Sequence, residues 1–372
     1  MPMNFFFRVD ASIEIGVGHM MRCLSLAEAL RNRGANCYFI SSSDNANLSG
    51  LAEEKGFDVH RISLPNETEV PPTEFRNVIG HPVQHASWLK ISWQEDAYCT
   101  NLILQNRKAD WLIVDHYAID QNWELAVKPH CQKLAVIDDL ADRAHTCDMI
   151  LDQNLGREFT DYDNLLPDHT SRLIGPRYAL LRPEFSQSRR QSLKRRAKFT
   201  LNRLLVTFGG IDKNNATGEV LRTLLDYPLP RECEITVVMG PSSPHLQTIR
   251  HLAEGMPWPT EVKVGVVNMA ELMANMDLAI GAAGITSWER CCVGLPSITV
   301  IIADNQSEGA RALRSTGAST LITDASQISV QLIESIDQIT RGTTMKDMSE
   351  AAVKVTDGQG VVRVVNHLIG ST

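Results

Sequence analysis

Short runs of apolar residues alternate with longer stretches of helical periodicity along most of the chain. In the first half, one such run is Phe5-Phe6-Phe7-Arg8-Val9, and others occupy residues 36–42, 57–62, 111–115, 134–138 and 149–151. A strand that is apolar along its whole length is buried on both faces, and strands that alternate with helices form parallel sheets. The first half, residues 1–185, is therefore predicted to be a doubly wound α/β domain.

The same alternation begins again after residue 200. The apolar runs of the second half lie at residues 201–207, 234–239, 261–264, 278–280, 297–301 and 320–322. They predict a second Rossmann-like domain over residues 201–345, and 372 residues are enough to build two cores. We expect two parallel-sheet domains that face each other across a cleft. Residues 346–372 are predicted to form helices, broken near 358–360, of which a terminal one crosses back to brace the two domains.

Two segments interrupt this alternation. Residues 186–200 combine little apolar content with a run of positive charge, which predicts a basic linker; contact with a polyanion is the alternative. Residues 63–93 contain four prolines and predict a long loop or an excursion over the domain surface.

Composition and charge narrow the classes of function. Hydrophobic residues make up 43% of the chain and charged residues 22%, which is typical of a globular protein. The net charge of -8 provides no positive field, so no nucleic-acid partner is predicted. We find no signal peptide, no run long enough to cross a membrane and no Cys-x-x-Cys pair among eight cysteines. A cytoplasmic protein with reduced thiols is expected, and its oligomeric state stays open.

A glycine-flanked histidine follows the first predicted strand. The segment Gly16-Val17-Gly18-His19 lies between that strand and a helical pattern. Glycines let the chain turn sharply and let a ligand approach the main chain, and the first amides of the following helix favour an anion. Gly18 and His19 are therefore candidate site residues, with His19 as a proton acceptor. The alternative is a structural turn with an incidental histidine.

Polar side chains also follow later strands of the first half. Asp115-His116-Tyr117 ends one strand, so these groups are expected at the same sheet edge as His19. Strand-end aspartates often only cap helices, an interpretation that applies to Asp115 and more strongly to Asp138-Asp139. His116 is the rival to His19, but no glycines flank it to admit a ligand.

The second half has its own glycine-rich loops after strands, at Gly209-Gly210 and at Gly281-Ala282-Ala283-Gly284. In the second loop, Thr286 or Ser287 is expected to cap a helix whose amides hold a diphosphate, and Glu289 is placed to accept hydrogen bonds from ribose. The alternative is a plain capped helix with a solvent-facing glutamate. No dinucleotide or P-loop motif is present, so NAD and ATP are not supported. The side-chain amides of Asn305 and Gln306 suit recognition of a sugar or a base. The alternative is that each is simply a turn residue.

Taken together, these motifs give the chain its resemblance to a known family. It resembles the UDP-sugar hydrolases of nonulosonic acid biosynthesis, in particular those of the pseudaminic acid pathway. The resemblance covers about residues 5 to 320. The stretches that match are Asp10-Ala11-Ser12, Gly16-Val17-Gly18-His19-Met20-Met21-Arg22-Cys23, Val114-Asp115-His116-Tyr117, Ile137-Asp138-Asp139-Leu140, residues 175–185, Phe208-Gly209-Gly210-Ile211-Asp212, residues 288–296 and Asn305-Gln306.

This resemblance implies a GT-B glycosyltransferase-like architecture in which water is the acceptor. It further implies that residues 281–289 grip UDP and that the acetamido sugar faces His19, the general base. The chain departs from the family at Ile285, where a serine is common, so one hydroxyl contact to the diphosphate is absent. The residues predicted to contact substrate are Gly18, Arg22, Asp115 and Tyr117, followed by Arg182, Gly209, Gly210, Gly284, Thr286, Ser287, Glu289, Asn305 and Gln306.

The implied reaction is hydrolysis of UDP-2,4-diacetamido-2,4,6-trideoxy-β-L-altropyranose at C1 with inversion, giving UDP and the free sugar. Diphosphate leaves readily, so one histidine base and several amide donors suffice where ordinary glycosidases pair two carboxylates. No cofactor is predicted, and no carboxylate cluster points to Mg²⁺. The alternatives are a GT-B glycosyltransferase with a hydroxyl acceptor, a UDP-sugar 2-epimerase and a non-catalytic nucleotide-sugar sensor. The sequence leaves an altro or a gluco-type sugar open.

Overall fold

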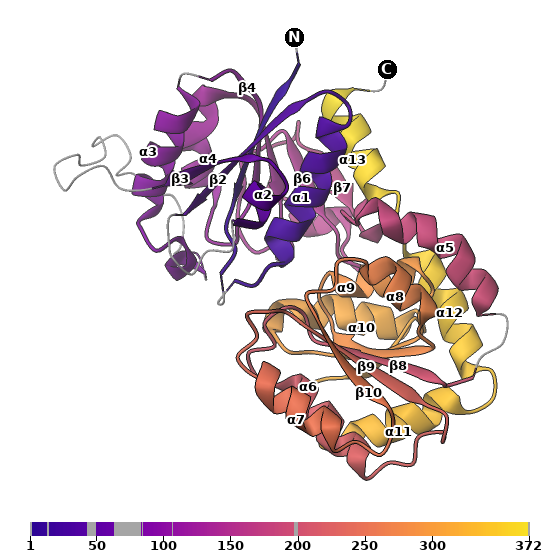
Figure 1. Ribbon diagram of the computed structural model, residues 1–372. Coiled ribbons are helices and arrows are strands. Elements are labelled where there is room, and N and C mark those ends of the chain that lie inside the picture. Colours follow the sequence, from indigo (N-terminus) through magenta and orange to yellow (C-terminus); the bar gives the residue numbers. More distant parts are fainter. Residues whose placement is uncertain are drawn as a thin grey trace. The chain divides into compact units, whose positions relative to one another are not determined.

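The chain forms two compact units, shown in Figure 1. The computed structural model describes residues 2–12, 15–42, 50–62, 83, 85–105, 107–196 and 200–370. The N-terminal unit comprises Met1–Gln153, Arg157–Leu180 and Val361–Thr372, and the C-terminal unit comprises Asn154–Gly156 and Leu181–Gly360.

The N-terminal unit contains a seven-stranded parallel sheet with the order β3-β2-β1-β4-β5-β6-β7. The chain leaves β1 toward β2 on one side and returns to β4 on the other. The point between β1 and β4 is therefore a topological switch point, where parallel sheets of this kind bind ligands beyond the carboxyl ends of their strands. The strands are β1 (Asn4–Val9), β2 (Asn36–Ser42), β3 (Asp58–Ile62), β4 (Ala109–Asp115), β5 (Cys131–Ile137), β6 (Met149–Asp152) and β7 (Ser171–Ile174).

Helices cover both faces of this sheet because successive side chains of its strands point to opposite faces. In β1, Phe5 and Phe7 share a core with α1 (Gly18–Arg31), α2 (Gly50–Glu54) and α13 (Gly360–Ile369). Phe6 points to the opposite core, which α3 (Trp93–Leu104) and α4 (Gln121–Val127) complete. The C-terminal helix α13 is fastened to this unit, since the indole of Trp111 donates to the Leu368 carbonyl at 3.0 Å.

The C-terminal unit contains a six-stranded parallel sheet with the order β10-β9-β8-β11-β12-β13. Its switch point lies between β8 and β11, so the loops after these two strands are neighbours. The strands are β8 (Arg203–Thr207), β9 (Glu234–Met239), β10 (Thr260–Val264), β11 (Leu278–Ala282), β12 (Ser297–Val300) and β13 (Thr320–Ile322).

Eight helices described in the C-terminal unit surround this sheet (Figure 1). The helices α6, α7, α11 and the start of α12 share one apolar core with the sheet, and α5 contacts α8 and α9. The helices are α5 (Pro183–Arg195), α6 (Ala216–Leu225), α7 (Leu246–Glu254), α8 (Met269–Asn275), α9 (Thr286–Cys292), α10 (Ser307–Ser315), α11 (Ile328–Thr340) and α12 (Thr344–Val355).

The strands predicted from apolar runs are present, with ends that differ by a few residues. One strand, β7, was not predicted. Its sequence, Ser171-Arg172-Leu173-Ile174, is half polar, and it pairs only with β6 at the edge of the sheet, where one side of a strand need not be buried. The apolar run on which the prediction depended is therefore too short here.

The basic linker predicted over residues 186–200 was wrong for its described part, because α5 continues to Arg195. The charges of this segment are used to fasten the helix to its neighbours. The Arg189 guanidinium donates to the carbonyls of Cys292, Thr356 and Val353 at 2.6, 2.9 and 2.7 Å. Arg195 pairs with Asp277 at 2.6 Å, and Arg196 donates to the Met276 and Met273 carbonyls. Hydrogen bonds from arginines to carbonyls at helix ends thus hold α5 in place. The prediction had considered only apolar residues as a sign of a folded element.

The prolines at 65, 71, 72 and 82 lie outside the described residues, as does most of the surface excursion predicted over 63–93. Residues 85–105 are described, and they form a 3₁₀ helix, Ala86–Leu89, followed by α3.

Candidate active site

His19 lies in the first turn of α1, directly beyond the carboxyl end of β1. The turn that leads to it closes through a hydrogen bond from the Gly16 amide to the Ser12 carbonyl at 2.7 Å, and Gly16 has a φ of +84°. Only glycine adopts such a backbone readily. A Cβ at Gly18 would meet no described atom within 4 Å, so space remains beside the start of the helix.

The imidazole of His19 is paired with a buried carboxylate. Its Nδ1 lies 2.6 Å from Asp115 Oδ1, and Asp115 ends β4, the strand beside β1 across the switch point. Arg22, one turn after His19, donates to both Asp115 oxygens at 2.6 and 2.7 Å. Burial alone would raise the pKa of Asp115, but the Arg22 guanidinium outweighs it and holds that pKa well below its usual range. Asp115 is therefore an ionised acceptor at neutral pH.

This pairing fixes the tautomer of His19. An ionised carboxylate can only accept, so Nδ1 carries the proton and Nε2 presents its lone pair. Nε2 makes no hydrogen bond to any residue in the described part of the chain, and His19 as a whole is 8% exposed. A second Arg22 nitrogen lies 3.2 Å from Nδ1, but the shorter contact with Asp115 determines where the Nδ1 proton points. The arrangement supplies an oriented imidazole that can accept a proton through Nε2.

Two further residues complete this cluster. The Tyr117 hydroxyl donates to Asp139 at 2.6 Å, and Arg22 pairs with the same carboxylate at 2.8 Å. The Tyr117 ring packs edge-on against His19, with centroids 4.7 Å apart and an interplanar angle of 81°. Asp139 thus braces both Arg22 and Tyr117.

The structure therefore brings together four residues that the sequence singled out in this unit, His19, Arg22, Asp115 and Tyr117. It adds Asp139, for which helix capping was the favoured interpretation. Neither aspartate caps a helix, because residues 138–148 form none: Asp138 is held in a turn, where it accepts from the Ala141 amide at 2.8 Å and from Arg143 and Tyr162. The sequence feature that could have identified Asp139 as a site residue was its position after β5, the strand next to the one that Asp115 ends.

His116, the rival base, belongs to a buried structural network. Its Nε2 lies 3.3 Å from Asp10, and its Nδ1 accepts from the Ala118 amide. Asp10 also pairs with Arg8 and accepts from the Ser42 amide, so it ties the carboxyl ends of β1 and β2 together. Burial lowers the pKa of His116 and keeps it neutral. A histidine 3% exposed with both nitrogens directed into this network is poorly placed to meet substrate.

In the C-terminal unit, Glu289 lies in the first turn of α9 with its side chain 14% exposed, and its carboxylate lies 3.7 Å from Arg182. Burial raises the pKa of Glu289 to about 7, although the Arg182 charge opposes this. Arg182 also donates to the Val267 carbonyl at 2.9 Å, and Val267 is 86% exposed. The Arg182 guanidinium thus links the Glu289 carboxylate to the main chain at the exposed Val267. Val267 was not predicted, since a lone valine after a strand carries no chemical signal.

The predicted cap of α9 was wrong. The residue at the N-cap position is Ile285, and no side chain caps the helix. Ser287 is 1% exposed, and its hydroxyl accepts from Arg290 at 3.0 Å. The amides of Ser287 and Trp288 donate to the carbonyls of Gly284 and Ile285. The Ser287 side chain is therefore directed into the interior of the unit, whereas Thr286 is half-buried at the start of the helix.

The remaining predicted residues line the loops beyond β8, β11 and β12. Gly209 follows β8 with a φ of +85°, and the Gly210 carbonyl lies so close to Gly240 that a Cβ there would overlap it. The Gln306 amide accepts from the Ile302 amide at 3.2 Å and lies 3.9 Å from where a Cβ of Gly284 would be. Asn305 precedes it in the 3₁₀ helix Asp304–Gln306.

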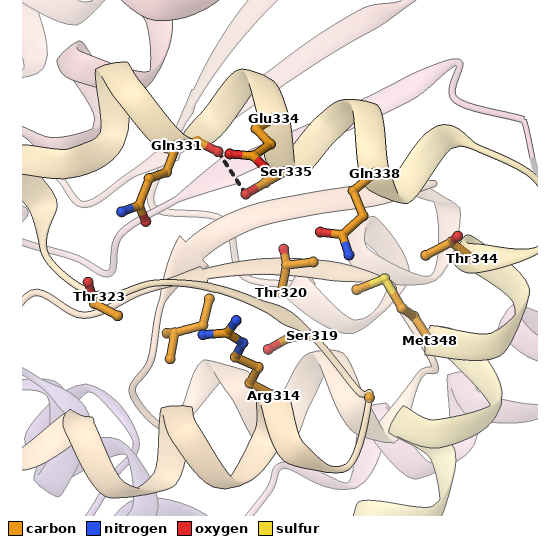
Figure 2. Close-up of a pocket in the computed structure, with 12 residues that line it drawn as sticks. Arg314, Ser319, Thr320, Thr323, Gln331, Glu334, Ser335, Gln338, Thr344 and Met348 are labelled. Atoms are coloured by element: carbon orange, nitrogen blue, oxygen red, sulfur yellow. Dashed lines mark hydrogen bonds between the residues drawn. The ribbon is translucent and has the colours of Figure 1, made fainter.

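Two cavities of the C-terminal unit lie apart from these residues. One, of about 550 Å³, is lined by the start of α6 and by residues after β12 and β13. The other, of about 530 Å³, opens beside the edge strand β13 (Figure 2), where Arg314 of α10 and Thr320 face Gln331 and Glu334 of α11. None of the predicted site residues lines either cavity.

Within the described residues, no group of three or more His, Cys, Asp and Glu side chains is arranged to hold a metal ion. Over the same ranges, no helix is both long enough and apolar enough to cross a membrane.

The two units define the class of fold, which is that of the GT-B glycosyltransferases. The structure resembles MurG of Acinetobacter baumannii with a TM-score of 0.65 and 15% identity, covering 99% of both chains. The predicted fold, α/β with two Rossmann-like parallel-sheet domains of the GT-B type, is confirmed. The sequence profile of the glycosyltransferase family 28 C-terminal domain matches residues 212–362.

Two sequence relatives are also similar to this chain. It is 27% identical over 314 residues to an uncharacterized protein of Methanocaldococcus jannaschii, a match that covers 82% of this chain and 57% of that protein. It is 24% identical over 252 residues to the UDP-2,4-diacetamido-2,4,6-trideoxy-beta-L-altropyranose hydrolase of Campylobacter jejuni, covering 68% of this chain and 75% of the relative. The chain thus matches little more than half the length of the first relative.

Proposed function

We propose that the protein hydrolyses UDP-2,4-diacetamido-2,4,6-trideoxy-β-L-altropyranose to UDP and the free sugar. The observation that carries this proposal is the buried pair of His19 and Asp115, which leaves Nε2 of the imidazole without a described partner. The similarity to the hydrolase of Campylobacter jejuni supports the choice of substrate.

In the proposed reaction, water binds at His19 Nε2 and attacks C1 of the sugar. His19 takes one proton from that water while its oxygen forms the new bond to C1. The bond between C1 and the diphosphate oxygen breaks, and its electron pair leaves with UDP. Attack opposite the leaving group inverts C1. Asp115 stabilises the imidazolium that forms, as an ionised carboxylate paired with Nδ1 does in other histidine-dependent hydrolases.

By the same proposal, the C-terminal unit binds the nucleotide. The Glu289 carboxylate accepts from ribose hydroxyls, and Arg182 keeps this carboxylate oriented from 3.7 Å away. The exposed Val267 side chain suits the flat face of the base. Gly209, Gly210, Gly284, Thr286, Asn305 and Gln306 remain proposed contacts of the diphosphate and nucleoside.

A transferase that passes the same sugar to a hydroxyl acceptor is the second candidate. The family 28 profile and the likeness to MurG favour it specifically. A sensor would use the same fold but needs no oriented base, whereas an epimerase would use such a base to take a proton from C2 rather than from water.

The deciding experiment follows the purified protein with this UDP-sugar in H₂¹⁸O by NMR and mass spectrometry. Hydrolysis at C1 releases UDP without any added acceptor, places ¹⁸O in the sugar and first gives the inverted anomer. Label in a phosphate, release of UDP only with an acceptor, or a sugar changed at C2 would each reject the proposal. Addition of EDTA tests the expectation that no metal is needed.

Two variants assign the base. His19→Ala should lower kcat by about 10²–10⁴-fold, the usual contribution of a positioned base. His116→Ala is the matched control, because it removes a buried strand-end histidine that lies in the Asp10 network. If the folded His116→Ala protein loses as much activity as His19→Ala, the assignment of His19 fails.

A further inference from the structure

Three aromatic rings form a connected group that reaches the candidate base through Tyr117, and the proposed reaction gives none of them a role. Trp88 stacks against Tyr117 with centroids 5.6 Å apart and an interplanar angle of 23°. His85 contacts both, at 4.6 Å from Trp88 and 5.6 Å from Tyr117. Tyr117 in turn contacts His19 at 4.7 Å. We call His85, Trp88 and Tyr117 the aromatic cluster.

The cluster is held in place from beneath. Leu89, the last residue of the 3₁₀ helix Ala86–Leu89, is 3% exposed and packs in the core under α3 and α4. Tyr117 is fixed through its hydrogen bond to Asp139. His85 and Trp88 remain half-buried, while Ala86 and Ser87 between them are exposed. The short helix thus has its apolar anchor in Leu89, and Trp88 is partly buried against the same core.

The cluster offers an apolar surface without a positive charge. Burial lowers the pKa of His85, the Asp142 carboxylate opposes this and the Arg143 charge adds to it, so His85 is mainly neutral at pH 7. Close contact between an aromatic ring face and carbon–hydrogen groups is favourable, because it removes apolar surface from water. A ligand group that suits this surface carries methyl groups rather than charge or many hydroxyls.

We propose that the aromatic cluster is a subsite for the methyl-bearing substituents of the donor sugar, and that Trp88 and His85 determine specificity for deoxy-acetamido sugars. The inference rests on the proposed function. A 2,4-diacetamido-2,4,6-trideoxy sugar carries three methyl groups, two on the acetamides and one at C5, whereas glucose carries none. A surface beside His19 places these groups next to the atom that accepts the proton.

Binding of intact substrate tests this subsite. All titrations use His19→Asn protein, so that the UDP-sugar survives, and calorimetry gives the affinities for the UDP-trideoxy sugar, UDP-glucose and UDP. Trp88→Ala should weaken binding of the UDP-trideoxy sugar about tenfold or more. This is the smallest change in affinity expected when one methyl-sized group loses its contact in an apolar pocket. The same variant should leave UDP unchanged and UDP-glucose nearly so. Trp88→Phe should restore most of the affinity.

Trp93→Ala is the matched control, because Trp93 is also a partly buried tryptophan packed on the same core but has no ring contact with the cluster. Equal losses in Trp88→Ala and Trp93→Ala, or an equal loss of UDP and UDP-sugar affinity, would overturn the subsite. Turnover by the wild-type protein is measured separately. If turnover is absent but sugar binding depends on Trp88, the proposed hydrolysis fails and the subsite stands; turnover with sugar binding independent of Trp88 gives the reverse.

Discussion

Replacement of Asp115 by asparagine isolates the charge that orients the candidate base. The two oxygens of Asp115 accept from His19 and twice from Arg22, so an amide cannot satisfy all three donors. If the amide oxygen faces His19, the NH₂ group meets the Arg22 Nε donor. If the amide is turned around, the NH₂ group donates to Nδ1, and Nε2 becomes protonated and can no longer accept.

The size of the effect follows from these two orientations. The wrong tautomer removes the base, which is worth about 10²–10⁴-fold in kcat, or about 3–5 kcal/mol in the activation barrier. Removing one partner of a buried ion pair costs about 3–5 kcal/mol of stability. We expect the lower part of that range, because Arg22 keeps its contact with Asp139. The assays are the initial rate of UDP release and the free energy of unfolding in urea.

Asp138→Asn is the matched control for this prediction. Asp138 is also fully buried, ends a neighbouring strand and pairs with an arginine, Arg143, at 2.9 Å. It should lose comparable stability while its kcat stays within about threefold of wild type. A folded Asp115→Asn protein whose kcat is also within threefold of wild type would refute the role given to the His19 and Asp115 pair.

Three further predictions concern the C-terminal unit. The pKa of Glu289, raised by burial to about 7, implies that affinity for uridine rises about tenfold between pH 6 and pH 8 as the carboxylate ionises, which calorimetry measures. Because the folded pKa lies above the unfolded value of 4.5, the stability that Glu289 contributes is present below about pH 4.5 and is lost as pH rises through 7. Gly281→Ala should lower the free energy of unfolding by at least about 1–3 kcal/mol, because its Cβ would overlap a main-chain oxygen of β8. Arg189→Met should cost about 3 kcal/mol, because it removes three hydrogen bonds from a charged donor, and urea denaturation measures both changes.

Each of these has a matched comparison. Glu289→Gln should give a flat pH profile for uridine; a profile that still rises would place the titrating group elsewhere. Gly50→Ala should be nearly neutral, because a Cβ there meets no described atom within 4 Å. Arg190→Met changes an exposed neighbour in the same helix and should leave stability unchanged. Equal effects at Arg189 and Arg190 would contradict the account of α5 as a fastened helix.

The candidate site shows why strand ends were informative in one unit and less so in the other. In the N-terminal unit, Asp115 ends β4, Asp139 lies two residues beyond the neighbouring strand β5, and His19 follows β1 on the other side of β4. Because β1, β4 and β5 are adjacent and parallel, residues at those three positions lie at the same carboxyl-terminal edge of the sheet. In the C-terminal unit, Ser287 occupies an equally favourable place in the sequence, yet its side chain turns inward to Arg290. Which way a helical side chain points depends on the register of the helix against its sheet.

The two parallel sheets could be predicted from local pattern, since strands buried on both faces must be apolar throughout. The same is true of the glycine-flanked position of His19. Tertiary structure alone decided that Asp115 orients His19, that Asp139 braces Tyr117 and Arg22, that α5 is folded, and that His85 and Trp88 reach the base through Tyr117. These facts depend on contacts between residues far apart in the chain, and the residue types involved occur just as readily in caps, linkers and cores. The local sequence pattern shows which residues of a segment are buried. The partner of each polar group is decided only by the tertiary arrangement of the strands, which brings distant residues into contact.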